Sequence, residues 1–276
     1  MHNKLEKLKC ILRECGSVAV AFSNGVDSTF LLKVARDTLG KENVIAVSAF
    51  CEFVSTKEHE GGIKFCNEND IEFREASLNI LDDEIIKKNP QNRCYFCKKT
   101  IFTEIIKIAD CKKEETGRSF IVCEGSNVDD LSDYRPGLKA IEELSIKSPL
   151  REAGLTKKEI RELSKELKIS TWNKPSMACF ASRFVYGEEL TDEKLRMVEK
   201  AEEYIRGKLD ENISLRVRVH GDKPNIVARI EVPREHVNSV MGMSELSAFL
   251  HELGFSYVTM DIDGFRSGSM NEAINK

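Results

Sequence analysis

The sequence predicts an α/β protein, in which a parallel sheet with helices on both faces is followed by a small α+β C-terminal domain. In the N-terminal part of the 276 residues, short apolar runs alternate with amphipathic stretches of helical length. Further along, two segments alternate polar and apolar residues on either side of a short turn. Strands that alternate with helices are typical of a parallel sheet whose site lies at the carboxyl ends of its strands.

The first strand is expected at 17–22, an apolar run that leads into the polar turn SNGVDS. The helix after this turn is expected to end at Gly40, because glycine commonly terminates helices. The same periodicities predict the remaining elements of this part, which are strands at 43–49, 71–76 and 119–127 and helices at 55–69 and 98–109. This alternation indicates a sheet that is covered on both faces.

A change of pattern follows Ser148-Pro149. An amphipathic helix is predicted at 155–169 and a charged helix at 191–206. The segments 213–221 and 225–233 alternate in period two around GDKP and predict a β-hairpin. A helix at 234–253 and a strand at 256–262 complete the smaller unit. Two domains are expected. Residues 1–185 would form the α/β domain with the parallel sheet, and residues 186–276 a small α+β domain for substrate binding or oligomerisation.

Composition excludes several classes of protein. Lys and Arg total 42 against 46 Asp and Glu, a net charge of −4, so no basic surface for nucleic acid is expected. No apolar run approaches the roughly 18–20 residues that span a bilayer, and the N-terminus resembles no signal peptide. We therefore expect a cytoplasmic protein with no membrane or nucleic-acid partner. In a reducing compartment its nine cysteines are expected to be ligands, nucleophiles or buried small apolar residues rather than disulfides.

The turn SNGVDS, 23–28, predicts an anion site. It stands between a buried strand and a helix, where backbone N–H groups and the helix N-terminus converge. It has neither the spacing of a Walker A loop nor that of a dinucleotide-binding turn. An ordinary turn with Ser and Asp caps is the alternative.

Cys94 and Cys97 form a C-x-x-C pair, which fits a redox dithiol, half of a zinc site or part of an iron–sulfur cluster. No second C-x-x-C or H-x-x-x-H completes a zinc site. The six cysteines other than these two and Cys179 show no ligand spacing and are interpreted as packing residues, namely Cys10, Cys15, Cys51, Cys66, Cys111 and Cys123.

Longer motifs resemble a known family. SNGVDS is similar to the PP-loop of ATP pyrophosphatases, with Asn24 in place of the second glycine, and 149–169 followed by KPS is similar to their second shared block. Four further segments resemble the LarE family of ATP-dependent sulfur transferases: GSNVDDLSDYRPGLKA, PSMACFASRFVYG, RVRVHG and DIDGFRSGSMNE. This resemblance covers essentially the whole chain. The ATP-binding residues that it implies are Ser23, Gly25, Val26, Asp27, Ser28, Gly125 and Ser126.

The resemblance also implies a reaction. ATP adenylylates a carboxylate of pyridinium-3,5-biscarboxylic acid mononucleotide, and a sulfur nucleophile then displaces AMP to leave a thiocarboxylate. Cys179 is the implied nucleophile, and Lys174 or Arg183 would lower its pKa. The cluster-bearing type implies a [4Fe-4S] cluster on Cys94, Cys97 and Cys179 with one iron open to sulfide. Structural thiols or a redox pair remain the alternative for Cys94 and Cys97.

The remaining expectations concern substrate and partners. Arg183, Arg216 and Arg218 are expected to bind the mononucleotide, and a solvated sheet face is the alternative for the last two. Asp129 and Asp130 would position Mg²⁺ or cap their loop. Sulfide or a sulfur donor, and further copies of the chain in a homo-oligomer, are the expected partners. The rival functions are a tRNA-thiolating enzyme and a non-catalytic iron–sulfur or nucleotide-binding sulfur carrier or sensor.

Overall fold

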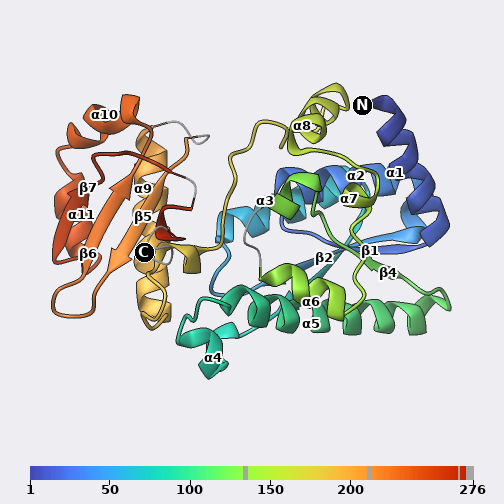
Figure 1. Ribbon diagram of the computed structural model, residues 1–276, viewed down its shortest axis with the longest axis horizontal. Coiled ribbons are helices and arrows are strands. Elements are labelled where there is room, and N and C mark those ends of the chain that lie inside the picture. Colours follow the sequence, from blue (N-terminus) through green and yellow to red (C-terminus); the bar gives the residue numbers. More distant parts are fainter. Residues whose placement is uncertain (133–135, 210–212, 267, 272–276) are drawn as a thin grey trace. The chain divides into compact units, whose positions relative to one another are not determined.

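The computed structural model describes residues 1–132, 136–209, 213–266 and 268–271 (Figure 1). The chain forms two compact units, one of residues 1–80 and 92–174 and the other of residues 81–91 and 175–276. The expected boundary, at 185, differs from this division by the segments 81–91 and 175–185. Parts of two motifs, at 133–135, 267 and 272, lie outside the described residues.

Unit 1 contains a four-stranded parallel sheet in the order β3-β2-β1-β4. Buried apolar residues make up most of β1, β2 and β4, because helices cover both faces of the sheet, whereas the edge strand β3 carries charged, partly exposed residues. The strands are β1 (Val18–Ala21), β2 (Val44–Phe50), β3 (Glu72–Ser77) and β4 (Ile121–Cys123). This arrangement confirms the predicted fold class.

Helices cover both faces of this sheet (Figure 1). On one face, α1, α2, α3 and α8 contribute to a cluster that includes Leu8, Phe30 and Ile160. On the other, α5 and α6 enclose a second cluster around Phe102 and Ile141. The helices of unit 1 are α1 (His2–Cys15), α2 (Val26–Leu39), α3 (Thr56–Glu68), α5 (Arg93–Thr116), α6 (Gly137–Glu143), α7 (Pro149–Glu152) and α8 (Lys157–Glu166).

Unit 2 contains a three-stranded sheet in the order β5-β6-β7. The predicted hairpin is confirmed, because β5 (Arg216–His220) and β6 (Val227–Glu231) pair antiparallel, while β7 (Tyr257–Met260) pairs parallel to β6. The helices of this unit are α4 (Glu84–Lys87), α9 (Asp192–Lys208), α10 (Val237–Met241) and α11 (Leu246–Glu252). None of the helices in the described parts of the chain is long and apolar enough to cross a membrane.

Three predictions about local structure were wrong. The helix expected at 234–253 is interrupted after Gly242 into α10 and α11, and glycine is a poor helix former. Helix α5 begins at Arg93 rather than at 98, so the C-x-x-C pair lies in its first turns. Cys10 and Cys111 are exposed and are therefore not packing residues.

Candidate active site

The edge between β1 and β4 is where the strand order reverses. The chain moves from β1 through β2 to β3 on one side, whereas β4 pairs with β1 on the other. In open parallel sheets, ligands bind at such a switch point, outside the carboxyl ends of the strands. The loops after β1 and after β4, residues 22–25 and 124–127, both lie there, and they hold most of the expected nucleotide-binding residues.

Asn24 gives the loop after β1 its shape. Its φ is 54°, in the left-handed region that asparagine tolerates better than most residues. Its side-chain amide donates to the carbonyl oxygen of Glu58 on α3 at 3.0 Å. A Cβ on Gly61 would lie only 2.8 Å from that amide nitrogen, so a glycine on α3 provides the room. Asparagine at this position therefore anchors the loop to a neighbouring helix.

Two serines hold the rest of this loop. The Ser28 hydroxyl accepts from the backbone N–H of Ser23 at 3.3 Å, donates to the carbonyl of Gly25 at 3.2 Å and lies 3.1 Å from the Ser23 hydroxyl. Helix α2 begins immediately afterwards at Val26. The N–H groups of its first turn have no intrahelical carbonyl, and they carry the positive end of the helix dipole. The loop therefore has the geometry of a phosphate cradle.

The loop after β4 approaches this first turn closely. A Cβ on Gly125 would lie 3.0 Å from the Ser28 nitrogen and 3.2 Å from its Cα, so any side chain here would crowd the backbone at the start of α2. Buried Glu124 fixes the following residues, because its carboxylate accepts from the N–H of Ser126 at 2.9 Å, from the Ser126 hydroxyl at 2.7 Å and from the Ser148 hydroxyl. The sequence analysis missed Glu124, which no motif spacing singles out.

Asp27 is the charged member of the loop. Burial is the largest influence and raises its pKa, and the ion pair with Lys157 opposes this shift. The charge of Asp130 raises the pKa further, and that of Arg161 lowers it. One carboxylate oxygen, Oδ1, is buried and has no hydrogen-bond partner among the described residues. An unpartnered buried carboxylate oxygen is costly, and its presence here fits a site that receives a cation or a donor with its ligand.

Asp129 and Asp130 serve as caps. Asp129 accepts from the backbone N–H of Lys157 at the start of α8, at 2.8 Å, and Asp130 accepts from the N–H of Asn127 at 2.9 Å. These bonds correspond to the capping alternative. The ammonium of Lys174 donates to the carbonyl oxygen of Asn24, at 2.8 Å, and pairs with Glu58, at 2.6 Å. Lys174 therefore contacts the loop after β1, a role that the sequence analysis did not assign to it.

In unit 2, three buried arginines bind the segment that carries the exposed Cys179. The carbonyl oxygens of Ala178 and Cys179 accept from Arg183 at 2.6 and 3.1 Å. Arg216 donates to the carbonyl of Ser176 at 2.6 Å, and Arg218 donates to that of Ser182 at 2.9 Å. Arg216 and Arg218 are 5% and 4% exposed, so the alternative of a solvated sheet face was wrong.

The arginines differ in how their charges are compensated. Arg183 forms a bidentate pair with buried Glu202 on α9, with both contacts at 2.9 Å, and Arg218 pairs with Glu231 at 2.8 and 3.0 Å. Burial raises the pKa of Glu202, but the charges of Arg183, Arg206 and Arg216 outweigh burial and lower it to about 2. Arg216 lies over the Phe265 ring and forms no ion pair with a carboxylate among the described residues.

None of the three cysteines proposed as cluster ligands forms a disulfide within the part of the chain that the structure describes. Cys94 and Cys97 are one helical turn apart on α5 in unit 1, and Cys179 belongs to unit 2. Within each unit, no three His, Cys, Asp or Glu side chains of the described residues are grouped to hold a metal ion. The donor chemistry therefore fits a cluster only if α5, with Cys94 and Cys97, and the segment with Cys179 both contribute.

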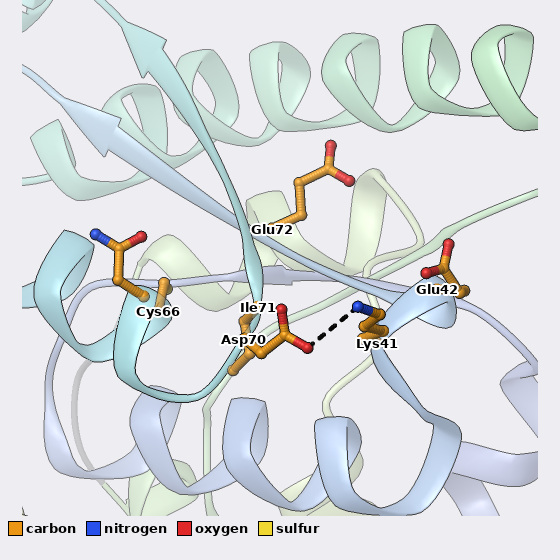
Figure 2. A pocket seen from close by; sticks show the side chains of 7 residues that line it. Lys41, Glu42, Cys66, Asp70, Ile71 and Glu72 are labelled. Carbon is orange, nitrogen blue, oxygen red and sulfur yellow. Dashed lines mark ion pairs between the residues drawn. The ribbon is translucent and has the colours of Figure 1, made fainter.

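A separate pocket of about 340 Å³ lies at the amino ends of β2 and β3, the opposite edge of the sheet (Figure 2). Charged side chains line it, and three of them are ion-paired: Lys41 with Asp70 at 3.4 Å, and Glu72 with Arg74 and Lys112. Cys66 is completely buried beneath it, and burial raises the pKa of its thiol to about 12. This pocket is distant in the fold from the switch point and offers no reactive group.

No family model matches the sequence. Comparison with curated proteins gives three full-length relatives. An uncharacterised protein of Synechocystis is 36% identical over 279 residues, covering all of both chains. The pyridinium-3,5-bisthiocarboxylic acid mononucleotide synthase of Lactiplantibacillus plantarum is 36% identical over 274 residues, covering 99% of this chain and 95% of the relative. An uncharacterised protein of Methanocaldococcus jannaschii is 32% identical, covering 96% of this chain and 98% of the relative.

Proposed function

This chain belongs to the LarE family and is an enzyme of the sulfurtransferase class, and we propose that it converts a carboxylate of a pyridinium biscarboxylate mononucleotide into a thiocarboxylate at the expense of ATP. The observation that carries the proposal is the near-complete alignment with a named bisthiocarboxylic acid mononucleotide synthase. The loop geometry at the switch point supports it, because it provides the phosphate cradle that an ATP-dependent reaction needs.

The proposed first step is adenylylation. The substrate carboxylate attacks the α-phosphorus of ATP, an acyl adenylate forms and pyrophosphate leaves. Ser23, Ser28 and the N–H groups at the start of α2 hold the phosphates, while Gly125 admits the nucleotide close to the backbone. Asp27 Oδ1 has a free lone pair for a Mg²⁺ ion that accompanies the triphosphate. Positioning and charge stabilisation are the contributions that such a site makes to the rate.

The second step transfers sulfur. Sulfide attacks the acyl carbon, AMP leaves with the electron pair of the acyl–oxygen bond, and the product thiocarboxylate loses its proton to solvent. Cys179 lies five residues after Lys174, which is bonded to the nucleotide loop.

Arg216 is the proposed acceptor-binding residue. A guanidinium that is desolvated without a carboxylate partner gains most from an incoming anion, since Arg183 and Arg218 are already neutralised by Glu202 and Glu231. We assign these two to holding the Cys179 segment. Their predicted contact with the substrate stays a prediction.

Cys94, Cys97 and Cys179 are the proposed ligands of a [4Fe-4S] cluster. When bound, such a cluster supplies an open iron that can carry sulfide. Cys94 and Cys97 lie three residues apart on one face of α5, which suits two ligands to one cluster. The chain's own contribution is to hold Cys94 and Cys97 in the first turns of one helix.

Anaerobic turnover with ATP, sulfide and the biscarboxylate mononucleotide tests the proposal. We expect AMP and pyrophosphate in equal amounts and a thiocarboxylate product that is heavier by one sulfur minus one oxygen. Accumulation of ADP, or nucleotide hydrolysis without a thiocarboxylate, would contradict the proposed reaction.

Variants of α5 test the cluster separately. Cys94→Ala should abolish the visible absorption of anaerobically purified protein, whereas Cys111→Ala, an exposed cysteine of the same helix, should leave it unchanged. The mass of Cys179 after turnover gives a second readout, because a sacrificed cysteine becomes dehydroalanine and loses H₂S. We expect no such loss. Stoichiometric zinc in place of iron would refute the cluster assignment.

A further inference from the structure

Helix α3 carries a polar residue on the face that packs against the sheet of unit 1. The buried residues of this helix are His59, Gly62, Phe65 and Cys66, which recur at helical spacing and therefore share one face. His59 is 9% exposed, although its side chain is polar. The steps proposed above give this histidine no role, so its contacts must explain why it lies on this face.

The His59 ring is held between two aromatic rings and a carboxylate. It stacks on Phe50 of β2, with ring centroids 4.3 Å apart, and meets Phe73 of β3 edge-on at 5.7 Å. Its Nε2 atom lies 2.7 Å from a carboxylate oxygen of Glu75 on β3. Because a carboxylate oxygen accepts and does not donate, Nε2 is the nitrogen that carries the proton in this contact. The ring therefore connects α3 to the edge strand of the sheet.

Packing alone does not account for a histidine at this position. His59 Nδ1 is buried and has no hydrogen-bond partner among the described residues. A buried polar atom without a partner costs stability. A phenylalanine would pack between Phe50 and Phe73 without that cost. What a phenylalanine does not reproduce is the directed contact with Glu75.

The residue that precedes this histidine on α3 holds the loop after β1. The carbonyl oxygen of Glu58 accepts from the Asn24 side chain at 3.0 Å, and its carboxylate pairs with Lys174 at 2.6 Å. Lys174 in turn donates to the carbonyl oxygen of Asn24 at 2.8 Å. One turn further along α3, a Cβ on Gly62 would lie 3.1 Å from the ring of Phe22. Helix α3 therefore supports this loop at three points.

We propose that His59 is a positioning residue of the nucleotide site: its contact with Glu75 fixes how α3 lies against the sheet, and α3 in turn holds the loop after β1 in the shape that binds the phosphates of ATP. This inference rests on the proposed ATP-dependent function. Successive residues of a helix are related by a rotation of about 100° and a rise of ~1.5 Å. Fixing His59 against β3 therefore also fixes where Glu58 presents its carbonyl and its carboxylate.

Titration of the protein with ATP and Mg²⁺, followed by calorimetry, tests the proposal. In His59→Phe the Kd for ATP should rise about 5-fold, because a shift of α3 disturbs all three contacts with the loop, while the KM for the mononucleotide should not change. His59→Gln places an amide nitrogen near the position of Nε2, so its Kd should stay within about twofold of the wild-type value. If the histidine only filled space, the order would be reversed, since phenylalanine packs better than glutamine between aromatic rings.

Glu75→Ala tests the same contact from the other side and decides the question if His59→Phe does not fold. The Glu75 side chain is 37% exposed, so its removal leaves no closed cavity. The Kd for ATP should again rise about 5-fold, and the double variant should be no weaker than either single one, because both act through one contact. Glu72→Ala is the matched control, since Glu72 lies on the same strand with the same exposure, and its Kd should be that of the wild type.

Hydrogen–deuterium exchange of the protein without ATP gives a second readout. The peptide that covers 22–28 should exchange faster in His59→Phe and Glu75→Ala, and at the wild-type rate in His59→Gln. The proposal is overturned if His59→Phe binds ATP as tightly as the wild type, or if His59→Phe and His59→Gln weaken binding equally. A wild-type protein that binds no ATP would refute the proposed function instead, and the exchange rates would still decide whether His59 positions the loop.

Discussion

At the first turn of α2 polar groups are left without partners, whereas Arg183 and Arg218 in unit 2 each have a buried carboxylate partner. Asp27 keeps a buried carboxylate oxygen that no described residue satisfies, and the N–H groups beside it have no helical acceptor. In unit 2, Arg183 and Arg218 each spend their guanidinium on a buried carboxylate and on backbone carbonyls. Unsatisfied groups are typical of a site that awaits a ligand, and satisfied groups of one that holds a segment in place.

The contrast teaches that arginine type and spacing do not identify a binding site. Arg216 and Arg218 are two residues apart on one strand, yet only Arg218 has a carboxylate partner among the described residues. A buried carboxylate that the fold places beside one arginine neutralises it, so only the arginine without such a partner is available to an anionic substrate. The predictions below test this division from the largest expected effect to the smallest.

Arg183→Met should cause the largest loss of stability. It leaves Glu202 buried with an incomplete set of partners, and breaking such a pair costs about 3–5 kcal/mol. Urea unfolding monitored by circular dichroism measures this loss. Arg196→Met on the exposed side of α9 should change stability by less than ~1 kcal/mol. Equal effects of the two substitutions would mean that the buried pair contributes no more to the free energy of unfolding than an exposed pair.

Acid should weaken the same cluster. The folded-state pKa of Glu202 is about 2, below its ordinary value of 4.5, so its contribution is complete above pH 4.5 and is lost as the pH falls towards 2. The loss should amount to roughly 3 kcal/mol at one pKa unit per ~1.4 kcal/mol. Stability measured from pH 5 to pH 2 should fall less steeply in Glu202→Gln, and an unchanged slope would contradict the assignment.

Asp27→Asn should separate function from stability in unit 1. Turnover should fall about 100-fold, equivalent to ~2.7 kcal/mol, because the nucleotide loses its carboxylate ligand. The melting temperature should stay unchanged or rise, since burying an ionised carboxylate costs stability. Asp37→Asn, an exposed residue of the same helix, should alter neither quantity. A lower melting temperature with normal turnover would reverse the assignment.

Arg216→Lys should raise the KM for the mononucleotide about 10-fold, because an ammonium cannot reproduce the guanidinium fork. The Kd for ATP should not change. Arg218→Lys should instead lower the melting temperature, with a smaller change in KM, since its fork is bound to Glu231. If Arg216→Lys weakens ATP binding and spares the KM, the residue belongs to the nucleotide site.

Asn24→Gly should have the smallest effect. Glycine relieves the left-handed backbone at φ 54° but loses the hydrogen bond to Glu58, and each contribution is about 1 kcal/mol. The equilibrium constant of unfolding and the Kd for ATP should therefore each change by less than about threefold. A Kd that falls more than 10-fold would mean that asparagine impairs nucleotide binding at this position.

Local patterns in the sequence determined the strand-turn-helix at 17–40 and the hairpin around GDKP, since each depends on periodicity and turn chemistry within one segment. The turn SNGVDS was interpreted from its resemblance to the PP-loop. The same patterns named Arg183, Arg216 and Arg218 but could not say what their side chains contact. The pairing of these arginines with Glu202 and Glu231 and the hydrogen bond from Lys174 to Asn24 were decided by tertiary structure. The physical reason is that a buried charge or thiol takes its properties from neighbours that are distant in the chain.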